Sequence, residues 1–454
     1  MPVLRTPLGE RGSRGTLVPN GHVPCLAPDV ARGAVSPSDD AVVADSIPAG
    51  MKTVLFLGAG RHQRAAILHA KELGLRVAAI DGNPDALALG DADIGEVVNF
   101  VDIPKAIEFA ERIRPDGVLT ITSDRAVVAV AAVAEALGLP GIGVDVAVGL
   151  THKIEMRRRL EAAGIPQPRF GSARTLEEAR AAGAHVGFPG VIKPADSGGQ
   201  RGVFRLDSVE DLEQQFPASL ELSRGGEVIV EEFVDGTEMN SMAVVRDGEV
   251  THLTLSDRHR PPGPGFAVGW IHAYPAALNG DGTSRAEAMV ADTLLALGLR
   301  NGIGFPQLIA HPDGRILMIE IAARIPGGQM ADLVHHAVGV DLVEVALRFA
   351  LGEPVTDELC APKFRRPTAI RFFTAQPGPL PTGKVLSVAS LDRVLAAPGV
   401  VQADSYLVPG ETIRPVQRDG DRRGYVIAVG ETGPEALERS EQAAALVDVD
   451  VEVE

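Results

Sequence analysis

The 454-residue sequence has few cysteines, few aromatic residues and no long apolar run. Its two cysteines, Cys25 and Cys360, lie far apart and form no CxxC or metal-binding pattern, which indicates a reducing compartment and no disulfide framework. No segment approaches the ~20 apolar residues of a membrane helix, and none resembles the apolar core of a signal peptide. We therefore expect a soluble, cytoplasmic protein without a membrane partner.

Positive charge is also scarce, since the formal net charge is −17. A general nucleic-acid binder needs a cationic face for the phosphate backbone, so we expect no nucleic-acid partner. Small anionic ligands are not excluded, because a few lysines and backbone N–H groups can capture them. The chain is rich in small apolar residues and long enough for two to four domains, which favours an α/β fold.

Residues 1–50 mix Pro, Gly, Ser and Arg without periodicity, and we expect a disordered extension there. Its arginines would suit a transit peptide, but its several acidic residues fit that class poorly. Met51, just before the first predicted strand, is an alternative start.

Residues 51–148 alternate buried strands with amphipathic helices and predict a Rossmann-like α/β lobe. Gly58 and Gly60 follow the first strand and Asp81 ends the next, as in part of a dinucleotide-binding fingerprint. The third glycine is replaced by Gln63. A nicotinamide-dependent dehydrogenase is therefore one alternative, and a purely structural lobe is the other.

A predicted strand carrying Lys193 leads into a glycine-rich segment, SGGQRG, at residues 197–202. Such a loop lets backbone N–H groups approach phosphate oxygens while a lysine adds positive charge. It lacks the P-loop pattern and leads into a strand, so a plain flexible hairpin explains it equally well. Downstream, Glu231 and Glu232 end another strand, and a turn follows at Asp235-Gly236.

Residues 302–328 predict a β-hairpin, because Asp313-Gly314 separates two apolar runs. With those two residues as the turn, Gln307 lies opposite Glu320. Strict alternation then directs Leu317, Ile319 and Ile321 to a core, and Gln307, Met318 and Glu320 to the other side. An acid there must face water, a metal or a ligand.

The segment 256–275 is rich in Pro and Gly and holds the only tryptophan, Trp270. Its cationic residues indicate a lid that covers an acidic or zwitterionic substrate. A helix is predicted from Met330 to Leu351. From Arg366 onward, short strands and a helix at 433–447 predict an α+β subdomain.

Together, a lysine on a helix, a lysine before a glycine-rich loop, a glutamate pair and a carboxylate-bearing hairpin resemble the ATP-grasp superfamily across residues 51–454. The segments EIAARIPGG (320–328) and AVGVDLVEVALRFALGE (337–353) are most similar to L-amino-acid ligases and related carboxylate–amine ligases. The resemblance implies an ATP-grasp domain at 149–360, with a flexible lid lobe at about 165–235. A Rossmann-like lobe would precede it, and a β-rich α+β subdomain would follow at 361–454.

The resemblance also implies the site. ATP would be bound by Lys153, Lys193, Ser197, Gly198, Gly199, Gln200, Gly202, Glu231, Glu232, Phe233, Val234 and Glu238. Mg²⁺ or Mn²⁺ would be held by Glu320 and Gln307, and the catalytic residues would be Arg324, Lys193 and Glu320. Substrates would contact Arg258, His259, Trp270, His272, Arg324, Gly327 and Gly328.

The activity implied is ATP-dependent ligation of a small-molecule carboxylate to an amine, with an amino acid as one substrate. An acyl phosphate would be the intermediate, and ADP and phosphate would be released. A bicarbonate-phosphorylating carboxylase of the biotin or purine type is an alternative. A non-catalytic ATP-binding regulatory module is an alternative of another class. The resemblance is also compatible with a homodimer.

Overall fold

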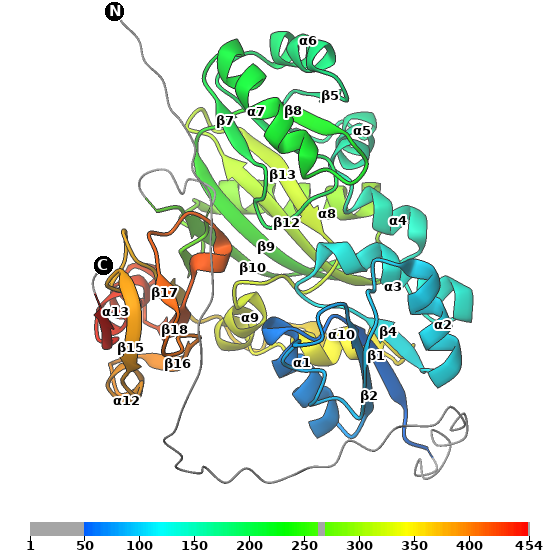
Figure 1. Cartoon of the computed structure of the whole chain (residues 1–454), viewed down its shortest axis with the longest axis vertical. Helices are drawn as coiled ribbons and strands as arrows, with labels where there is room; N and C mark the ends of the chain where they lie inside the picture. The colour runs from blue at the N-terminus through cyan, green and yellow to red at the C-terminus, as the bar shows by residue number, and fades with distance from the viewer. Residues whose placement is uncertain (1–49, 262–267, 453–454) are drawn as a thin grey trace, which may run out of the picture. The chain divides into compact units, whose positions relative to one another are not determined.

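The computed structural model describes residues 50–261 and 268–452 (Figure 1). The predicted disordered extension at 1–50 lies outside the described residues apart from Gly50, and so does part of the predicted lid, at 262–267. Within the described ranges, no helix combines the length and the apolarity that crossing a bilayer requires.

The first lobe is a parallel four-stranded sheet in the order β3-β2-β1-β4, flanked by helices. All five residues of β1 are buried, as expected for a parallel sheet covered on both faces. The elements are β1 (Thr53–Leu57), α1 (Arg61–Glu72), β2 (Arg76–Asp81), β3 (Ile94–Val97), α2 (Ile103–Ile113), β4 (Gly117–Leu119), α3 (Asp124–Leu137) and α4 (Val144–Gly149).

A small antiparallel sheet in the order β5-β8-β6-β7 forms the next lobe, after helix α5 (Lys153–Ala162). Helices α6 and α7 pack against it through a buried cluster that includes Ile192, Leu212 and Val230. The elements are β5 (Phe170–Ala173), α6 (Leu176–Val186), β6 (Gly190–Pro194), β7 (Phe204–Leu206), α7 (Val209–Glu221) and β8 (Val228–Glu232).

An eight-stranded antiparallel sheet in the order β13-β12-β9-β10-β11-β14-β18-β16 organises the rest of the chain. Its elements up to residue 360 are β9 (Thr237–Arg246), β10 (Glu249–His259), β11 (Ile271–Tyr274), α8 (Gly280–Ala296), β12 (Gly302–Ala310), β13 (Ile316–Ala322), α9 (Met330–Val338), α10 (Leu342–Ala350) and α11 (Asp357–Cys360). Strand β14 (Thr368–Phe372) pairs with β11, so the sheet continues past the predicted domain boundary at 360/361.

The remaining C-terminal elements complete this sheet and add a second one, in the order β17-β15-β19. They are β15 (Gly383–Val388), α12 (Asp392–Leu395), β16 (Val400–Ser405), β17 (Thr412–Ile413), a 3₁₀ turn (Asp419–Asp421), β18 (Gly424–Val429), α13 (Gly433–Ala444) and β19 (Val449–Glu452). The predicted mixture of short strands and one longer helix is present.

Gln307 lies opposite Glu320 in the β12–β13 hairpin, as predicted, but the loop and the pairing next to it differ from the prediction. The loop spans residues 311–315, and of its residues only Gly314 has a positive φ, +89°. Pairing near the loop is consequently shifted by one residue, with Ala310 opposite Ile316, and a bulge at Ile319 restores the register.

The bulge also corrects the predicted faces of β13. Met318 packs in the core with Ile321, whereas Leu317 and Ile319 pack with Val234 on the opposite side. The prediction was therefore wrong for Leu317, Met318 and Ile319, because an extra residue in one strand breaks the alternation of period two.

The single helix predicted from Met330 to Leu351 is two helices, α9 and α10. Gly339 ends α9 with φ +76°, a left-handed conformation that glycine adopts without strain. Asp341 then caps α10, because its carboxylate accepts hydrogen bonds from the N–H groups of Val343 and Glu344.

Candidate active site

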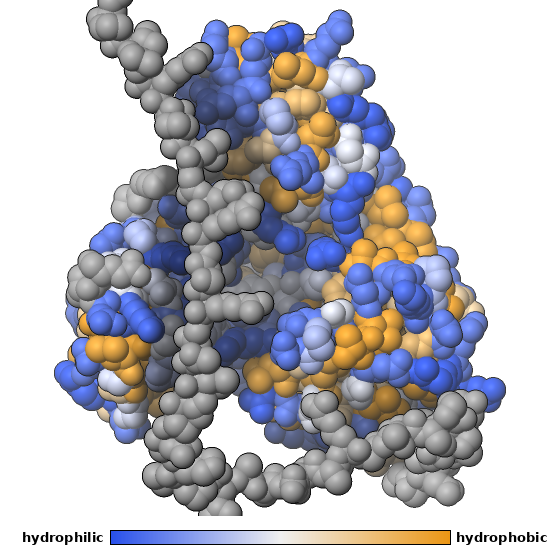
Figure 2. Space-filling view, viewed as in Figure 1, coloured by the Kyte–Doolittle hydropathy of each residue, from blue (hydrophilic) through white to orange (hydrophobic). Residues whose placement is uncertain are grey.

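A cavity of about 470 Å³, here called the main cavity, gathers most of the predicted site residues. It is lined by residues of the small sheet, of the large sheet, of α5 and of the first lobe. The face in Figure 2 is hollowed near its centre, and much of the visible hollow is hydrophilic. Predicted residues on its wall are Lys153, Lys193, Ser197, Gly198, Gly199, Gln200, Glu231, Glu232, Phe233, Val234, Glu238, Arg258, His272, Gln307, Glu320, Arg324, Gly327 and Gly328.

Three predicted residues are not on that wall: Gly202, His259 and Trp270. The Trp270 ring instead stacks under the Arg371 guanidinium, whose central carbon is 4.2 Å from the ring centroid. His259 is paired with Ile271 in the sheet. A period-two strand places neighbouring side chains on opposite faces, so His259 cannot share the face of Arg258.

Lys193, on β6, is buried in an ion-pair network. Its Nζ lies 2.7 Å from Glu231 Oε2, and Arg157 Nε donates to Glu231 Oε1 at 2.8 Å. Burial by itself would raise the pKa of Glu231, but Arg157 and Lys193 outweigh that effect and lower it to about 2. Glu231 is therefore ionised at neutral pH. Burial lowers the pKa of Lys193, and the Glu231 carboxylate opposes that effect.

Lys153, the first residue of α5, holds Glu320 beside the glycine-rich loop. Its Nζ donates to the Ser197 carbonyl oxygen at 2.7 Å and lies 3.2 Å from Glu320 Oε1. Burial would raise the pKa of Glu320, but Lys153 and Lys193 lower it. Glu320 is therefore ionised, and it lies near two lysines whose ammonium groups can bind an anionic ligand.

Gln307 lies in a hydrogen-bonded row across the large sheet. Its Nε2 donates to Asn240 Oδ1 at 2.9 Å, and Asn240 Nδ2 contacts His272 Nδ1 at 3.1 Å. Burial lowers the pKa of His272 well below its usual value, with Arg258 and Arg422 adding to the effect. The ring is therefore neutral, and with Nδ1 as the acceptor its proton is on Nε2.

The donor set at Glu320 and Gln307 fits a magnesium ion. Within the described ranges, no group of three or more His, Cys, Asp or Glu side chains is arranged to hold a metal ion. Mg²⁺ is usually held by one or two carboxylates together with substrate phosphates, rather than by an all-protein cage. Glu320 supplies the carboxylate, and Gln307 Oε1 supplies an amide oxygen, since its Nε2 is bonded to Asn240.

Arg324 follows β13 and is held by the first lobe. Its Nη2 lies 2.5 Å from Asp124 Oδ1, and its Nη1 donates to the Ile325 carbonyl oxygen. Arg324 Nε is buried without a hydrogen-bond partner among the described residues. A buried unpartnered N–H on the wall of a cavity is a donor available to an oxyanion.

Glu238, which is predicted to bind ATP, is held by two arginines. Its carboxylate pairs with Arg258 and, at 3.2 Å, with Arg260 Nε. All three side chains line the main cavity. Glu238 therefore fixes two cations of the 256–275 segment against the large sheet.

The other end of the cavity is apolar. Val234, Ile309 and Leu317 form a buried cluster there, and Ile319 packs against it. The N–H groups of Glu232 and Phe233 are bonded to the Arg169 and Pro189 carbonyl oxygens. A flat base held between these apolar side chains would therefore find its backbone donor at Val234 rather than at those two residues.

The loop between β6 and β7 has the backbone that a phosphate-binding loop needs. Gly199, Gln200 and Gly202 have φ values of +69°, +61° and +72°. Positive φ values turn successive N–H groups toward one side and create an anion-binding concavity. This conformation is compatible with the phosphate-loop hypothesis, and two consecutive positive φ values are equally those of a type I′ hairpin turn.

In the first lobe, the residues of the partial dinucleotide fingerprint are engaged in other contacts. The Gln63 side chain lies within 3.6 Å of the position of a Cβ on Gly58, and it bonds to the Ile121 carbonyl oxygen and to Thr122. Asp81 Oδ2 accepts from the Ala59 N–H instead of being available to a ribose. Gln63 thus fills the space that a pyrophosphate would need, which argues against the dehydrogenase.

Several residues of the cavity and its supports were not predicted. Arg157 lies one helical turn after Lys153, so the two residues share a face of α5. This spacing could have predicted that Arg157 belongs to the site. Asn240 depends on the register of β9 against β12. Asp419 and Arg422 reach the cavity from the C-terminal segment, and no local pattern marks them.

Comparison with known proteins agrees with this geometry. Residues 152–358 match the ATP-binding domain of the carbamoyl-phosphate synthase large chain, and residues 371–452 match the L-amino acid ligase C-terminal domain 2. The uncharacterised protein y4rH of Sinorhizobium fredii is 31% identical over 324 residues, which cover 68% of this chain and 63% of that protein.

Two further relatives align over most of the chain. A formate-dependent phosphoribosylglycinamide formyltransferase of Synechococcus sp. (strain CC9605) is 28% identical, over 89% of this chain and 98% of its own. The crystal structure of an L-amino acid ligase from Bacillus licheniformis covers 88% of this chain and 99% of its own, with a TM-score of 0.76 and 21% identity. The chain therefore has the predicted α/β ATP-grasp fold with a β-rich C-terminal part, and the proteins that it resembles are ATP-grasp ligases that form C–N bonds and release ADP.

Proposed function

We propose that this chain is an ATP-dependent carboxylate–amine ligase that takes an amino acid as one of its substrates. The observation that carries the proposal is the contribution of the C-terminal segment to the main cavity. The segment that matches the L-amino acid ligase domain supplies both a carboxylate, on Asp419, and a guanidinium cation, on Arg422, to the cavity wall.

That pair of opposite charges suits a zwitterion. Asp419 Oδ1 is buried without a hydrogen-bond partner among the described residues, 3.6 Å from Arg422 Nη2. A buried unsatisfied oxygen costs about 1–3 kcal/mol, which a substrate ammonium group would recover. Arg422 and Arg324 offer cations for carboxylate groups in the same cavity.

The lysines and Glu320 serve the phosphoryl transfer. The substrate carboxylate attacks the γ-phosphorus of ATP, which gives an acyl phosphate and ADP. Lys153 and Lys193 offset the negative charge that otherwise repels the attacking carboxylate, and the 197–202 loop covers the phosphates. Glu320 and Gln307 would hold the Mg²⁺ (or Mn²⁺), whose charge would supply further neutralisation of the phosphates.

Arg324 serves the second step. The amine attacks the acyl carbon, the C–O bond to phosphate breaks, and the nitrogen loses a proton. The guanidinium, oriented by Asp124, donates its unpartnered Nε–H toward the oxyanion that develops on the acyl oxygen. Once the 197–202 loop covers the phosphates, it would keep water from hydrolysing the acyl phosphate.

A second candidate uses formate as the carboxylate. It is supported by the similarity to formate-dependent phosphoribosylglycinamide formyltransferases, of which one aligns over 98% of its length. The bicarbonate-dependent carboxylase and the regulatory module stay as alternatives from the sequence. A cytoplasmic location and a homodimer likewise stay predictions.

One experiment separates these functions. Phosphate release from Mg-ATP is measured with pooled L-amino acids, with formate plus phosphoribosylglycinamide, and with bicarbonate plus biotin, and the condensed product is identified by mass spectrometry. A dipeptide or amino-acid amide supports the proposal. A formylated ribonucleotide or a biotin-dependent signal without amino acids contradicts it, and no phosphate release in any arm favours the regulatory module.

A further inference from the structure

A second cavity, of about 250 Å³, lies against the same lysine and loop as the main cavity. We call it the rear cavity. Lys153, Ser197, Gly198 and Glu320 line both cavities, and so does Asp124. These shared residues form the partition between them, at the point where the proposed function places the transferred phosphate.

Unpaired positive charge surrounds the rear cavity. Arg125 and Arg224 line it, and Arg201 lies close enough to repel Arg125. Burial lowers the pKa of Arg125, and repulsion from Arg224 and Arg201 lowers it further. Among the residues that the structure describes, none of these three guanidinium groups has an acidic partner within salt-bridge distance, in a chain of net charge −17.

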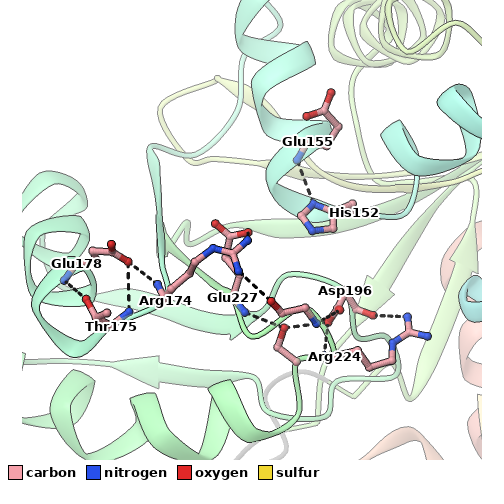
Figure 3. A network of polar contacts seen from close by, with 10 residues as sticks. His152, Glu155, Arg174, Thr175, Glu178, Asp196, Arg224 and Glu227 are labelled. Atoms are coloured by element: carbon pink, nitrogen blue, oxygen red, sulfur yellow. Dashed lines mark hydrogen bonds and ion pairs between the residues drawn. The ribbon is translucent and has the colours of Figure 1, made fainter.

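The carboxylates of the rear cavity are already engaged. Asp124 pairs with Arg324, and Glu320 pairs with Lys153. Asp196 accepts from Ser223 Oγ and from the N–H groups of Arg224 and Gly225. Figure 3 shows Asp196 with Arg224, whose Nη2 donates only to the Asp196 carbonyl oxygen, at 3.0 Å.

Two helices also begin at this cavity. Asp124 and Arg125 are the first two residues of α3, which is 14 residues long, and His152 is the N-cap of α5. His152 Nδ1 accepts from the Glu155 N–H (Figure 3). Helix N-termini add partial positive charge to that of the unpaired arginines.

We propose that the rear cavity binds inorganic phosphate through Arg125 and Arg224. Guanidinium groups are the side chains best matched to phosphate, because their fork of N–H donors fits its oxygens. The source of the phosphate rests on the proposed function. The ligase reaction releases a phosphate ion at the position between Lys153 and Glu320, and this ion passes the partition and leaves through the rear cavity. The loop at 197–202 then does not need to open before the phosphate leaves.

The test measures phosphate binding without turnover. The wild-type protein is saturated with Mg²⁺ and a non-hydrolysable ATP analogue, which fills the main cavity, and inorganic phosphate is then titrated by calorimetry. The wild type binds phosphate, and the double variant Arg125→Gln/Arg224→Gln binds it at least ~10-fold more weakly, because two charge-assisted contacts are lost. Affinity for the ATP analogue changes much less than affinity for phosphate does, because neither arginine lines the main cavity that holds the analogue.

A matched control removes the same charge elsewhere. Arg393→Gln/Arg414→Gln changes two exposed arginines that line neither cavity, and phosphate affinity stays at the wild-type value. Arg125→Lys keeps the charge but loses the guanidinium fork, so its phosphate affinity should lie between those of the wild type and the double variant. An unchanged circular dichroism spectrum of the double variant shows that α3 still forms.

Three results would each overturn the proposal: no phosphate binding to the analogue-loaded wild type, unchanged affinity in the arginine double variant, or a parallel loss of ATP-analogue affinity. Failure of the amino-acid ligase proposal would leave this measurement unaffected, because no carboxylate or amine substrate takes part.

Discussion

At the scale of single residues, the centre of the main cavity is a row of alternating charges. Arg157 and Lys193 share Glu231, and Lys153 contacts Glu320. Without a ligand, each lysine is held by an acid. A phosphate and a metal ion can replace the Lys153–Glu320 contact, since the cation then meets phosphate and the carboxylate meets the metal.

The first prediction concerns Glu320. Glu320→Gln should lower ADP formation by roughly 10²–10³-fold, because a neutral amide no longer attracts the metal that offsets phosphate charge. The far-ultraviolet circular dichroism spectrum should stay unchanged. Glu213→Gln, which disrupts an exposed pair with Arg180, is the control and should retain full activity. Near-normal turnover of the Glu320 variant would remove this residue from the metal site.

The second prediction uses the lowered pKa of Glu231, which is about 2 in the folded chain against a usual value of 4.5. Its ionic contribution is fully present above pH 4.5 and is lost as the pH falls toward 2. The free energy of unfolding should therefore decrease over this range by on the order of 3 kcal/mol from this group.

Urea denaturation at several pH values from 7 to 3 measures this effect. Glu231→Gln should be less stable at pH 7 by about 3–5 kcal/mol, because Arg157 and Lys193 remain buried without their acid. It should also lose less stability on acidification than the wild type. Equal pH dependence in both proteins would contradict the assignment.

At the scale of elements, two irregular segments of backbone position the site. The bulge in β13 lets consecutive residues, Ile319 and Glu320, both line the main cavity. Arg157 stabilises that bulge, since its Nη1 and Nη2 donate to the carbonyl oxygens of Met318 and Ile319 at 2.7 and 2.6 Å. The glycine-rich loop is the other segment.

The third prediction compares two glycines of that loop. Gly199 and Gly202 both have positive φ, so an alanine at either costs roughly 1–2 kcal/mol of backbone strain. A Cβ on Gly199 would meet no heavy atom within 4 Å, whereas one on Gly202 would lie 3.0 Å from Leu222 and Pro194. Gly202→Ala should therefore lower Tm further and raise the KM for ATP more than Gly199→Ala does. Equal effects would show that crowding at Gly202 is relieved by movement of Leu222.

At the scale of the whole molecule, the site is assembled from segments far apart in the chain. His62 of the first lobe, Glu231 of the small sheet, Glu320 of the large sheet and Arg422 of the C-terminal segment line one cavity. These described residues belong to one compact unit. Loss of any of these segments should therefore disable the site.

The fourth prediction is that the C-terminal segment cannot be removed. Truncation after residue 360 would leave β11 without β14, and this would expose a strand edge in the middle of the large sheet. The cavity would also lose Asp419 and Arg422. We expect an aggregated or inactive product, measured by size-exclusion chromatography and ADP formation. A soluble, ATP-binding 51–360 fragment would contradict this and support an independent ATP-grasp domain.

The fifth prediction is that residues 1–50 can be removed. The first strand begins at Thr53, and His62 is the first residue on the wall of the main cavity. A chain starting at Met51 should keep the Tm and the rate of ADP formation of the full-length protein. An insoluble product would argue against the predicted disordered extension.

Much of the site could be predicted because its residues belong to contiguous motifs. Lys193 stands directly before its glycine-rich loop, and Glu320 and Arg324 lie four residues apart at the end of one strand. In such segments, local backbone geometry places the side chains. The hairpin register survived an incorrect turn only because the bulge at Ile319 compensated for it.

The sequence by itself determined the α/β class, because periodicity is a local property. The order of its motifs carried the resemblance from which the ATP-binding residues were predicted. Only the tertiary structure decided the rest. It placed Asp124 on Arg324, enclosed Glu231 between Arg157 and Lys193, and brought Asp419 to the cavity. It also left Arg125, beside a second cavity, without an acidic partner among the described residues. These contacts join residues tens to hundreds of positions apart, and their energies depend on burial and on distance in space, which no local pattern encodes.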